Sequence, residues 1–199
     1  MDADPKQQVV LIRHGATEWS AAGRHTGRTD VPLTDAGRKE ASAIATRLRD
    51  WSFAAVLSSP LRRASETCRI AGMDDRARIE ENLREWDYGE YEGLTTKEIR
   101  VEIADWAVWT HGTPNGERAG DVGRRADRVL ATVRSVQGDV ALFSHGHFLR
   151  VLAARWCGFA PIEGRRFRLD TGTISILGFE RETPVIRLWN DDCHRGGSP

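Results

Sequence analysis

The chain has 199 residues, of which 40% are hydrophobic and 29% are charged, a composition typical of a soluble globular protein with one core. It carries 29 Lys and Arg against 29 Asp and Glu, so it has no net field to attract nucleic acid or a membrane surface, and we expect neither partner. Its three cysteines are odd in number and widely spaced, which argues against a disulfide framework and a zinc site and favours a cytoplasmic protein.

The first predicted element is a strand at residues 9–12. The run Val-Val-Leu-Ile shows no alternation, which indicates a strand of a parallel sheet that is buried on both faces. Arg13, His14 and Gly15 follow at the end where open α/β sheets bind ligands, and together they could hold and attack a phosphate. The tripeptide alone is weak evidence, because it occurs by chance in many chains.

A long polar loop and a helix come next. Residues 16–32 are too many for an ordinary connection, and we expect this loop to fold over His14. Thr34 offers an N-cap for a helix whose apolar residues recur at i, i+3, i+4 and i+7. These residues are Ala41, Ile44, Ala45 and Leu48. The spacing predicts a crossover helix with one buried face.

A second short strand is predicted at residues 53–57. The sequence Ser-Ser-Pro at residues 58–60 then predicts the start of a helix that runs to about Gly72. Arg62 and Arg63 fall in its first turn. Cations at that place oppose the helix dipole, which indicates that an anion binds nearby.

The middle of the chain alternates loops with predicted elements. Residues 79–83 suggest a strand that leads into residues 84–93, where carboxylates and aromatic rings gather as they do in loops that line sites. We expect a helix from Thr95 to about Trp109 and a loop at residues 111–117. A buried stripe predicts the next helix, and its members are Val122, Ala126, Val129, Leu130 and Val133.

The last part of the chain repeats the opening pattern. Residues 140–143 predict a buried strand that again ends in histidine and glycine, followed by a helix from about Phe148 to Cys157. Residues 173–179 and 185–189 predict a terminal pair of strands.

Strands that alternate with helices predict an α/β fold with three α/β/α layers around a mostly parallel sheet. We expect one domain across residues 1–199, with a core at about residues 8–189 and a loose polar tail at residues 190–199. No apolar run in the sequence is long enough to span a bilayer, so we expect no membrane segment.

Five chemically suited residues stand at the predicted strand ends and helix starts: Arg13, His14, Arg63, Glu85 and His145. The set fits phosphoryl transfer through a phosphohistidine, because arginines can hold the phosphoryl oxygens while a neutral imidazole attacks in line. Nearby positive charge disfavours the imidazolium and keeps His14 a nucleophile. Glu85 would protonate the departing alkoxide and then take a proton from the attacking water.

From residue 9 to about residue 179 the sequence resembles the histidine phosphatase superfamily, also called the phosphoglycerate mutase-like family. "LIRHGATEWSAAGRHTGRTDVPLTDAGRKEA" is similar to the first motif and loop, and "SSPLRRASET" to the second arginine motif. "LREWDYGEYEGLT" is similar to the acid motif, and "LFSHGHFLRVL" to the second-histidine motif. The resemblance implies the family's α/β fold, a phosphohistidine mechanism without metal, and no organic cofactor. It places the phosphate ligand on Arg63, the general acid on Glu85 and the second histidine on His145.

Longer matches such as "HTGRTDVPLT" and "REWDYGEYEGLTT" resemble the branch that contains actinobacterial acid phosphatases and fungal sedoheptulose bisphosphatases. This resemblance implies substrate contacts at Ser20, Thr26, Gly27, Tyr88 and Gly146. Ser20 stands where many members carry asparagine, which shortens or removes that contact with phosphate.

A second phosphate site is a further hypothesis. The long loop supplies Arg24, His25 and Arg28, and Arg118 stands where many phosphatases of the family have serine. If these cations face His14, they would hold the remote phosphate of a bisphosphate substrate. Each one taken singly is equally well explained as a solvated loop charge.

Other conspicuous residues have simpler interpretations. His147 invites a metal site, but no third ligand stands at ligand spacing, and we expect no metal. Arg62 is expected to be a solvated neighbour of Arg63. The acids Asp87, Glu90 and Glu92 are expected to be solvated, and the seven tryptophans to form core or pocket wall.

The leading hypothesis is a phosphatase whose partner is a small phosphorylated metabolite. Cofactor-dependent phosphoglycerate mutase is the alternative, but the short segment after Glu85 supplies little to keep water from a phosphoenzyme, which favours hydrolysis. A silent phosphate-binding module is a third hypothesis, and the presence of all five chemical residues argues against it. The sequence leaves a homodimer and the physiological substrate open.

Overall fold

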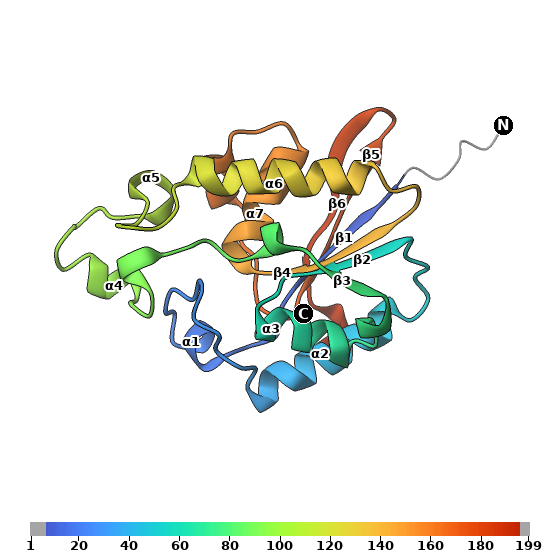
Figure 1. Ribbon diagram of the computed structural model, residues 1–199, viewed down its shortest axis with the longest axis horizontal. Coiled ribbons are helices and arrows are strands. Elements are labelled where there is room, and N and C mark those ends of the chain that lie inside the picture. The colour runs from blue at the N-terminus through green and yellow to red at the C-terminus, as the bar shows by residue number, and fades with distance from the viewer. Residues whose placement is uncertain (1–6, 196–199) are drawn as a thin grey trace.

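The computed structural model describes residues 7–195, and within them a six-stranded sheet runs in the order β3-β2-β4-β1-β5-β6 (Figure 1). The strands are β1 (Val9–Arg13), β2 (Ala55–Ser58), β3 (Ala77–Ile79), β4 (Val140–Ser144), β5 (Ile174–Glu180) and β6 (Thr183–Asp191). The first four strands along the chain pair in parallel, and β5 and β6 pair antiparallel. The predicted α/β fold with a mostly parallel sheet is confirmed.

Strands β1 and β4 lie side by side in the middle of this sheet. Their parallel register pairs Arg13 with Ser144. Both strands therefore end at the same edge, and the residues that follow them, His14 and His145, emerge next to each other. The backbone N–H of His14 donates to the Ser144 carbonyl at 3.0 Å, which continues the pairing one residue beyond the strand.

Helices cover both faces of the sheet, with α2 and α3 on one face and α6 and α7 on the other (Figure 1). The helices are α1 (Glu18–Ala21), α2 (Asp35–Leu48), α3 (Arg62–Ile70), α4 (Thr96–Ile99), α5 (Val108–His111), α6 (Ala119–Arg134) and α7 (Gly146–Trp156). Successive residues of β1 point to opposite faces, so Leu11 packs in the apolar cluster that contains Val129 of α6. Ile12 packs in the other cluster, which contains Ile44 of α2. Burial on both faces explains why the strand is apolar throughout.

Two predicted helices agree closely with the structure. Thr34 caps α2, because its hydroxyl accepts from the Gly37 N–H at 3.1 Å. In α6 all five residues of the predicted stripe are buried. The predicted terminal strands form the hairpin of β5 and β6.

The single helix predicted from Thr95 to Trp109 is wrong. Thr95 does cap a helix, but α4 ends after one turn, and α5 is a separate turn further along. Between them the chain bends so that Trp106 is buried and its indole N–H donates to the Gly112 carbonyl at 3.1 Å. Arg100 Nε donates to the Trp106 carbonyl at 2.8 Å, which stabilises the bend. These tertiary contacts outweigh the local preference for helix.

Three other predicted boundaries shift. The strand expected at residues 79–83 is β3, which ends at Ile79 and is followed by a 3₁₀ turn at Glu81–Leu83. The predicted helix start at residues 58–60 is wrong, because α3 begins at Arg62 and Leu61 caps it without a side-chain bond. The helix expected from Phe148 begins two residues earlier.

The tail prediction is wrong for its first residues. Strand β6 continues through Asn190, whose amide Nδ2 donates to Asp170 at 2.8 Å. A 3₁₀ turn at Cys193–Arg195 follows, and residues 196–199 of the predicted tail lie outside the described part of the chain.

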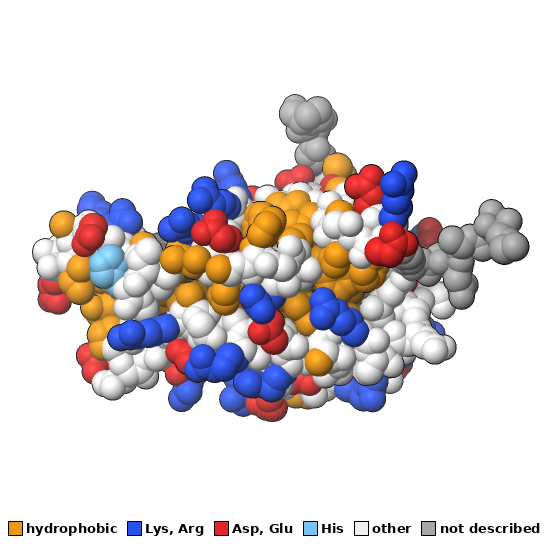
Figure 2. Space-filling model, turned by 90° about the horizontal axis from the view of Figure 1, so that it is seen from above, with side chains coloured by type: hydrophobic (Ala, Val, Ile, Leu, Met, Phe, Trp, Pro, Cys, Tyr) orange, Lys and Arg blue, Asp and Glu red, His pale blue; other side chains and the backbone are white. Residues whose placement is uncertain are grey.

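Figure 2 shows the face over α6, where hydrophobic side chains reach the surface among interspersed positive and negative ones. Mixed signs give this face no strong single-sign field. In the described range of residues 7–195, none of the helices combines the length and the apolar character needed to cross a membrane.

We predict that Gly37→Ala lowers the free energy of unfolding by about 2 kcal/mol. A Cβ atom at Gly37 would lie 2.1 Å from the Ala16 carbonyl oxygen, which belongs to the segment that follows His14. Thermal unfolding measures the change. Gly120→Ala is the control, because its Cβ would meet no atom closer than 3.8 Å. Equal melting temperatures for the two variants would contradict the prediction.

Candidate active site

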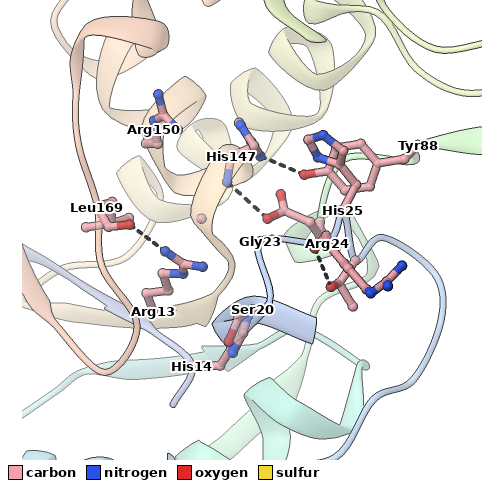
Figure 3. A pocket seen from close by; sticks show the side chains of 13 residues that line it. Arg13, His14, Ser20, Gly23, Arg24, His25, Tyr88, His147, Arg150 and Leu169 are labelled. Atoms are coloured by element: carbon pink, nitrogen blue, oxygen red, sulfur yellow. Dashed lines mark hydrogen bonds between the residues drawn. The ribbon is translucent and has the colours of Figure 1, made fainter. Parts of the chain in front are cut away.

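The structure brings all five predicted chemical residues together, each either on one cavity or in direct contact with another member of the set. The rings of His14 and His145 have centroids 5.1 Å apart. Arg13, His14 and Glu85 line a cavity of about 180 Å³ at the strand edge (Figure 3). Arg63 lies behind them, where its side chain contacts His145. The convergence follows from the parallel pairing of β1 with β4.

His14 is held as a neutral imidazole. Its Nδ1 lies 2.8 Å from the Gly15 carbonyl, so Nδ1 carries the proton and donates, which leaves the lone pair on Nε2. Burial lowers the pKa of His14 well below its usual range, and the charges of Arg63 and Arg13 lower it further. A neutral imidazole with a free Nε2 in this cavity is a nucleophile.

Arg13 lies against the start of α7. One of its terminal N–H groups donates to the Leu169 carbonyl, whereas its Nε is buried and has no partner among the described residues. A Cβ atom at Gly146 would lie 3.1 Å from the Arg13 guanidinium carbon, so only glycine admits the guanidinium without displacement. The unpartnered Nε is a donor that an anion in the cavity can take.

Arg63 is completely buried, and protein groups take most of its donors. Its Nη2 donates to the carbonyls of Thr26 and Gly27, and its Nη1 donates to the carbonyl of Thr29 at 3.0 Å. Its Nε donates to His145 at 3.1 Å. Four of five N–H groups are therefore used, and a single one on Nη1 is left for an anion. Arg63 cannot form a two-bond fork with phosphate in this arrangement.

His145 is the N-cap of α7, and Arg63 fixes its tautomer. Arginine can only donate, so His145 Nδ1 must accept, and the proton of the neutral ring is on Nε2. That Nε2 lies 2.8 Å from the Ser59 hydroxyl, which accepts. The same hydroxyl accepts from the Leu61 N–H at 3.3 Å, so Ser59 lies just before the N-cap of α3 and connects the start of that helix to His145. Burial and then the charge of Arg63 lower the pKa of His145 well below its usual range.

The Glu85 carboxylate occupies the N-terminus of α7. Its Oε1 accepts from the N–H groups of Trp86 and Phe148, both at 2.9 Å, and its Oε2 accepts from the His147 N–H at 3.0 Å. Free N–H groups at a helix start favour an anion at that place. These bonds fix the carboxylate on the wall of the cavity, where it can exchange a proton with a ligand.

The predicted substrate contacts divide into two groups. Ser20, Thr26, Tyr88 and Gly146 line the cavity, as expected, whereas Gly27 lines a neighbouring one. The Ser20 hydroxyl accepts from the Thr17 N–H at 2.9 Å within the capping box of α1. The Tyr88 hydroxyl lies 2.6 Å from His147 Nδ1, and burial raises the pKa of Tyr88 well above its usual range.

Of the four cations considered for a second phosphate, Arg24 and His25 line the cavity. Arg28 is exposed and pairs with Asp87 at 2.8 Å outside it. Arg118 is the N-cap residue of α6, and its side chain packs against Gly112, where an added Cβ atom would lie 2.9 Å from the Arg118 Cγ. That hypothesis is therefore wrong for Arg28, whose side chain pairs with Asp87, and for Arg118, which is exposed and does not line the cavity.

The prediction that the acids of the loop at residues 84–93 are solvated is also wrong for two of them. Asp87 pairs with Arg28, and Glu92 accepts from the N–H groups of Gly27 and Thr29. Arg62 is exposed, as predicted, and its Nε lies 3.6 Å from a carboxylate oxygen of Glu66. Trp86, Trp106 and Trp156 are buried in the core, also as predicted.

Arg150 and Leu169, which the sequence analysis does not single out, also line the cavity. So does His147, which the sequence analysis weighs only as a metal ligand and which lies in the first turn of α7. Arg150 stands four residues after Gly146, so helical spacing from that glycine could have indicated it. Among residues 7–195, no group of three or more His, Cys, Asp or Glu side chains is arranged to hold a metal ion.

Comparisons with known proteins agree with this geometry. The family model described as histidine phosphatase superfamily (branch 1) matches residues 9–192. A Mycobacterium tuberculosis protein named acid phosphatase is 45% identical over 188 residues, which are 91% of this chain and 92% of that protein. Sedoheptulose 1,7-bisphosphatase of Saccharomyces cerevisiae is 34% identical over 76% of this chain and 68% of its own length.

A solved structure of a Mycobacterium tuberculosis protein superposes with a TM-score of 0.88 at 41% identity and covers 92% of this chain and 97% of that one. An Escherichia coli protein named probable phosphoglycerate mutase is 30% identical over 92% of this chain and 89% of its own length. Phosphatases are therefore the more similar relatives among these.

We predict that stability falls as the pH drops below about 6.5, and that His25→Gln weakens this fall. Burial lowers the pKa of His25 from 6.5 to about 4. The unfolded chain therefore binds a proton at His25 more readily than the folded chain between these pH values, which favours unfolding. Melting temperatures measured from pH 7 to 4 give the slopes. His111→Gln, at an exposed histidine, is the control, and a slope in His25→Gln equal to that of the wild type would contradict the prediction.

Proposed function

The chain belongs to the histidine phosphatase superfamily and is a phosphatase, and we propose that it hydrolyses small sugar phosphates or related phosphomonoesters through a phosphohistidine at His14. The observation that carries the mechanism is the neutral His14 ring, with Nε2 free, in one cavity with Arg13 and Glu85. A cavity of about 180 Å³ is below the roughly 300–1,000 Å³ of sites for drug-sized ligands, which supports a small substrate.

In the first step Nε2 of His14 attacks phosphorus, and the bond from phosphorus to the leaving oxygen breaks. The free donors of Arg13 and Arg63 hold the phosphoryl oxygens as charge moves onto them. Glu85 gives its proton to the leaving alkoxide. In the second step Glu85 takes a proton from water, the water oxygen attacks phosphorus, and the bond to Nε2 breaks to release inorganic phosphate.

We propose further that the reaction needs neither metal nor organic cofactor, because the two arginines supply the positive charge that a cation otherwise provides. The cysteines Cys68, Cys157 and Cys193 are free, which supports a reducing cytoplasm as the location. The partner is a small phosphorylated metabolite rather than nucleic acid, and a homodimer is compatible with this function.

The mutase alternative is less supported. A mutase must protect its phosphoenzyme from water until the product is phosphorylated again. Of the described segment at residues 86–117, Tyr88 is the residue that lines the cavity, and α4 within it is a single turn. The relative named acid phosphatase is also more similar than the one named mutase, at 45% against 30% identity.

We predict that His14→Ala lowers kcat for nitrophenyl phosphate by at least about 1,000-fold and removes an acid-labile phosphoenzyme, because the nucleophile is lost. Activity of the wild type measured in EDTA should be unchanged. His111→Ala, at the surface, is the control. Substantial activity in His14→Ala would remove the nucleophile assignment, and loss of activity in EDTA that zinc or magnesium restores would remove metal independence.

We predict that Glu85→Gln slows hydrolysis of alkyl phosphates more than hydrolysis of nitrophenyl phosphate. An alkoxide is a poor leaving group and needs protonation, whereas nitrophenolate leaves without it. The measurement is kcat for both substrates in the variant and the wild type, and we expect the alkyl loss to be larger by about 10-fold or more. Equal losses on both substrates would show that Glu85 is not the general acid.

A further inference from the structure

Arg125 of α6 binds the segment that carries Glu85, and every one of its N–H groups has an acceptor. Its Nη1 donates to the carbonyls of Asn82 and Arg84, both at 2.8 Å, and its Nη2 donates to the Glu85 carbonyl at 3.2 Å. Its Nε and Nη2 also donate to the two carboxylate oxygens of Glu117, both at 2.7 Å. A guanidinium has five N–H groups in a fixed plane, so all five are used here. The side chain therefore fixes the backbone at Glu85 and just before it.

Glu117, the ion-pair partner of Arg125, binds the residues just after Glu85. Its Oε2 accepts from the Asp87 N–H, and its own N–H donates to the Asp87 carbonyl, both at 2.9 Å. Its carbonyl accepts from the indole N–H of Trp86 at 2.9 Å. The pair of Arg125 and Glu117 therefore holds the chain on both sides of Glu85.

Arg125 also packs against a residue that binds the Glu85 carboxylate. Its guanidinium carbon lies 5.0 Å from the centroid of the Phe148 ring. The N–H of Phe148 in turn donates to Glu85 Oε1 at 2.9 Å. The position of the carboxylate depends on the backbone that carries it and on the start of α7 that binds it. Arg125 contacts both of these parts.

A ligand site is the other role that the surroundings of Arg125 could suggest. Arg125 lines a cavity of about 270 Å³ next to the catalytic one, and Glu85 lies on the wall of both. Three arginines line this second cavity, and each forms an ion pair. The pairs are Arg28 with Asp87, Arg84 with Glu81, and Arg125 with Glu117. These cations already have partners, so the observations favour a positioning role for Arg125 over a site for an anion.

We propose that Arg125 is a positioning residue for the general acid, because it holds residues 82–87 so that the Glu85 carboxylate reaches the leaving oxygen. The proposal rests on the proposed phosphatase function, in which Glu85 protonates that oxygen. Arg125 lies behind Glu85 rather than on the wall of the catalytic cavity, so its effect on the reaction passes through Glu85. A shift of about 1 Å in a reacting group can cost roughly 100-fold in rate.

The test compares two substrates that share one ring and differ in their leaving group. Phenolate is the poorer leaving group and depends more on protonation, whereas nitrophenolate leaves without it. The measured quantity is the ratio of kcat for phenyl phosphate to kcat for nitrophenyl phosphate. A loss of folded enzyme lowers both rates equally and leaves this ratio unchanged, so the ratio separates a positioning role from a merely structural one.

In Arg125→Gln we expect the ratio to fall by about 3-fold or more, because glutamine cannot bond to three carbonyls and to Glu117 at once. Arg124→Gln is the matched control, since Arg124 is the preceding residue of α6, is exposed, and pairs with Asp121 on the same helix. We expect the wild-type ratio in this control. An unchanged ratio in Arg125→Gln, or an equal fall in Arg124→Gln, would overturn the proposal.

Arg125→Lys decides the question if Arg125→Gln does not fold. Lysine keeps a positive charge opposite Glu117, but a single nitrogen replaces the three nitrogens of the guanidinium. A ratio that falls by about 2-fold or more in Arg125→Lys supports the proposal. The wild-type ratio in this variant overturns it.

Glu85→Gln separates the proposal from the function on which it rests. We expect the ratio to fall in Glu85→Gln, and we expect Arg125→Gln to lower it no further when the two changes are combined. A further fall in the double variant would show that Arg125 acts by another route and would overturn the proposal. An unchanged ratio in Glu85→Gln would remove Glu85 as the general acid, and the proposal with it. Failure of the wild type to hydrolyse nitrophenyl phosphate would instead overturn the proposed function.

Discussion

The Arg63 guanidinium is completely buried between α3 and the loop that follows β1, and four hydrogen bonds hold it there. Burial of a charge is costly unless hydrogen bonds satisfy it, so these bonds are a condition of the fold. They attach the carbonyls of Thr26, Gly27 and Thr29 to the site. They also set the tautomer of His145, and the charge itself lowers the pKa values of His14 and His145. One side chain thus connects the loop, the second histidine and the nucleophile.

The chain carries equal numbers of positive and negative groups, but the site does not. Arg13, Arg63 and Arg150 have carbonyls or a ring nitrogen as partners, and Glu85 is the acid on the cavity wall. The local excess of positive charge is stable because backbone carbonyls orient each guanidinium. A protein with no net charge can therefore form an anion site, because the fold gathers arginines at one place and orients them with neutral backbone carbonyls.

Burial gives the imidazoles of the site their chemical character. His14, His145 and His147 are each enclosed, and burial is the largest cause of the lowered pKa in all three. Within the same buried site, different hydrogen bonds give His14 and His145 different tautomers. His14 donates from Nδ1 to a carbonyl and keeps Nε2 free, whereas His145 accepts at Nδ1 and carries its proton on Nε2. The two histidines, each of which directly follows a strand, therefore carry their protons on different ring nitrogens.

The sequence by itself determined the features that depend on local pattern. Apolar runs without alternation identified β1 and β4, helical spacing identified α2 and α6, and the histidine after each strand identified the edge where the site lies. These patterns can be recognised in the sequence because the buried face of a strand or helix requires apolar residues at regular positions.

Only the tertiary structure decided the features that depend on contacts between distant residues. Trp106 interrupts the helix expected from Thr95 because its indole reaches Gly112, and Ser59 lies before α3 with its hydroxyl bonded to both His145 and the Leu61 N–H. Arg150 looked like any helical arginine in the sequence. Its place on the cavity wall depends on α7 beginning at the strand edge and on contacts of its side chain with Trp109 and Gly164. A local sequence pattern cannot indicate contacts with residues that lie so far away along the chain.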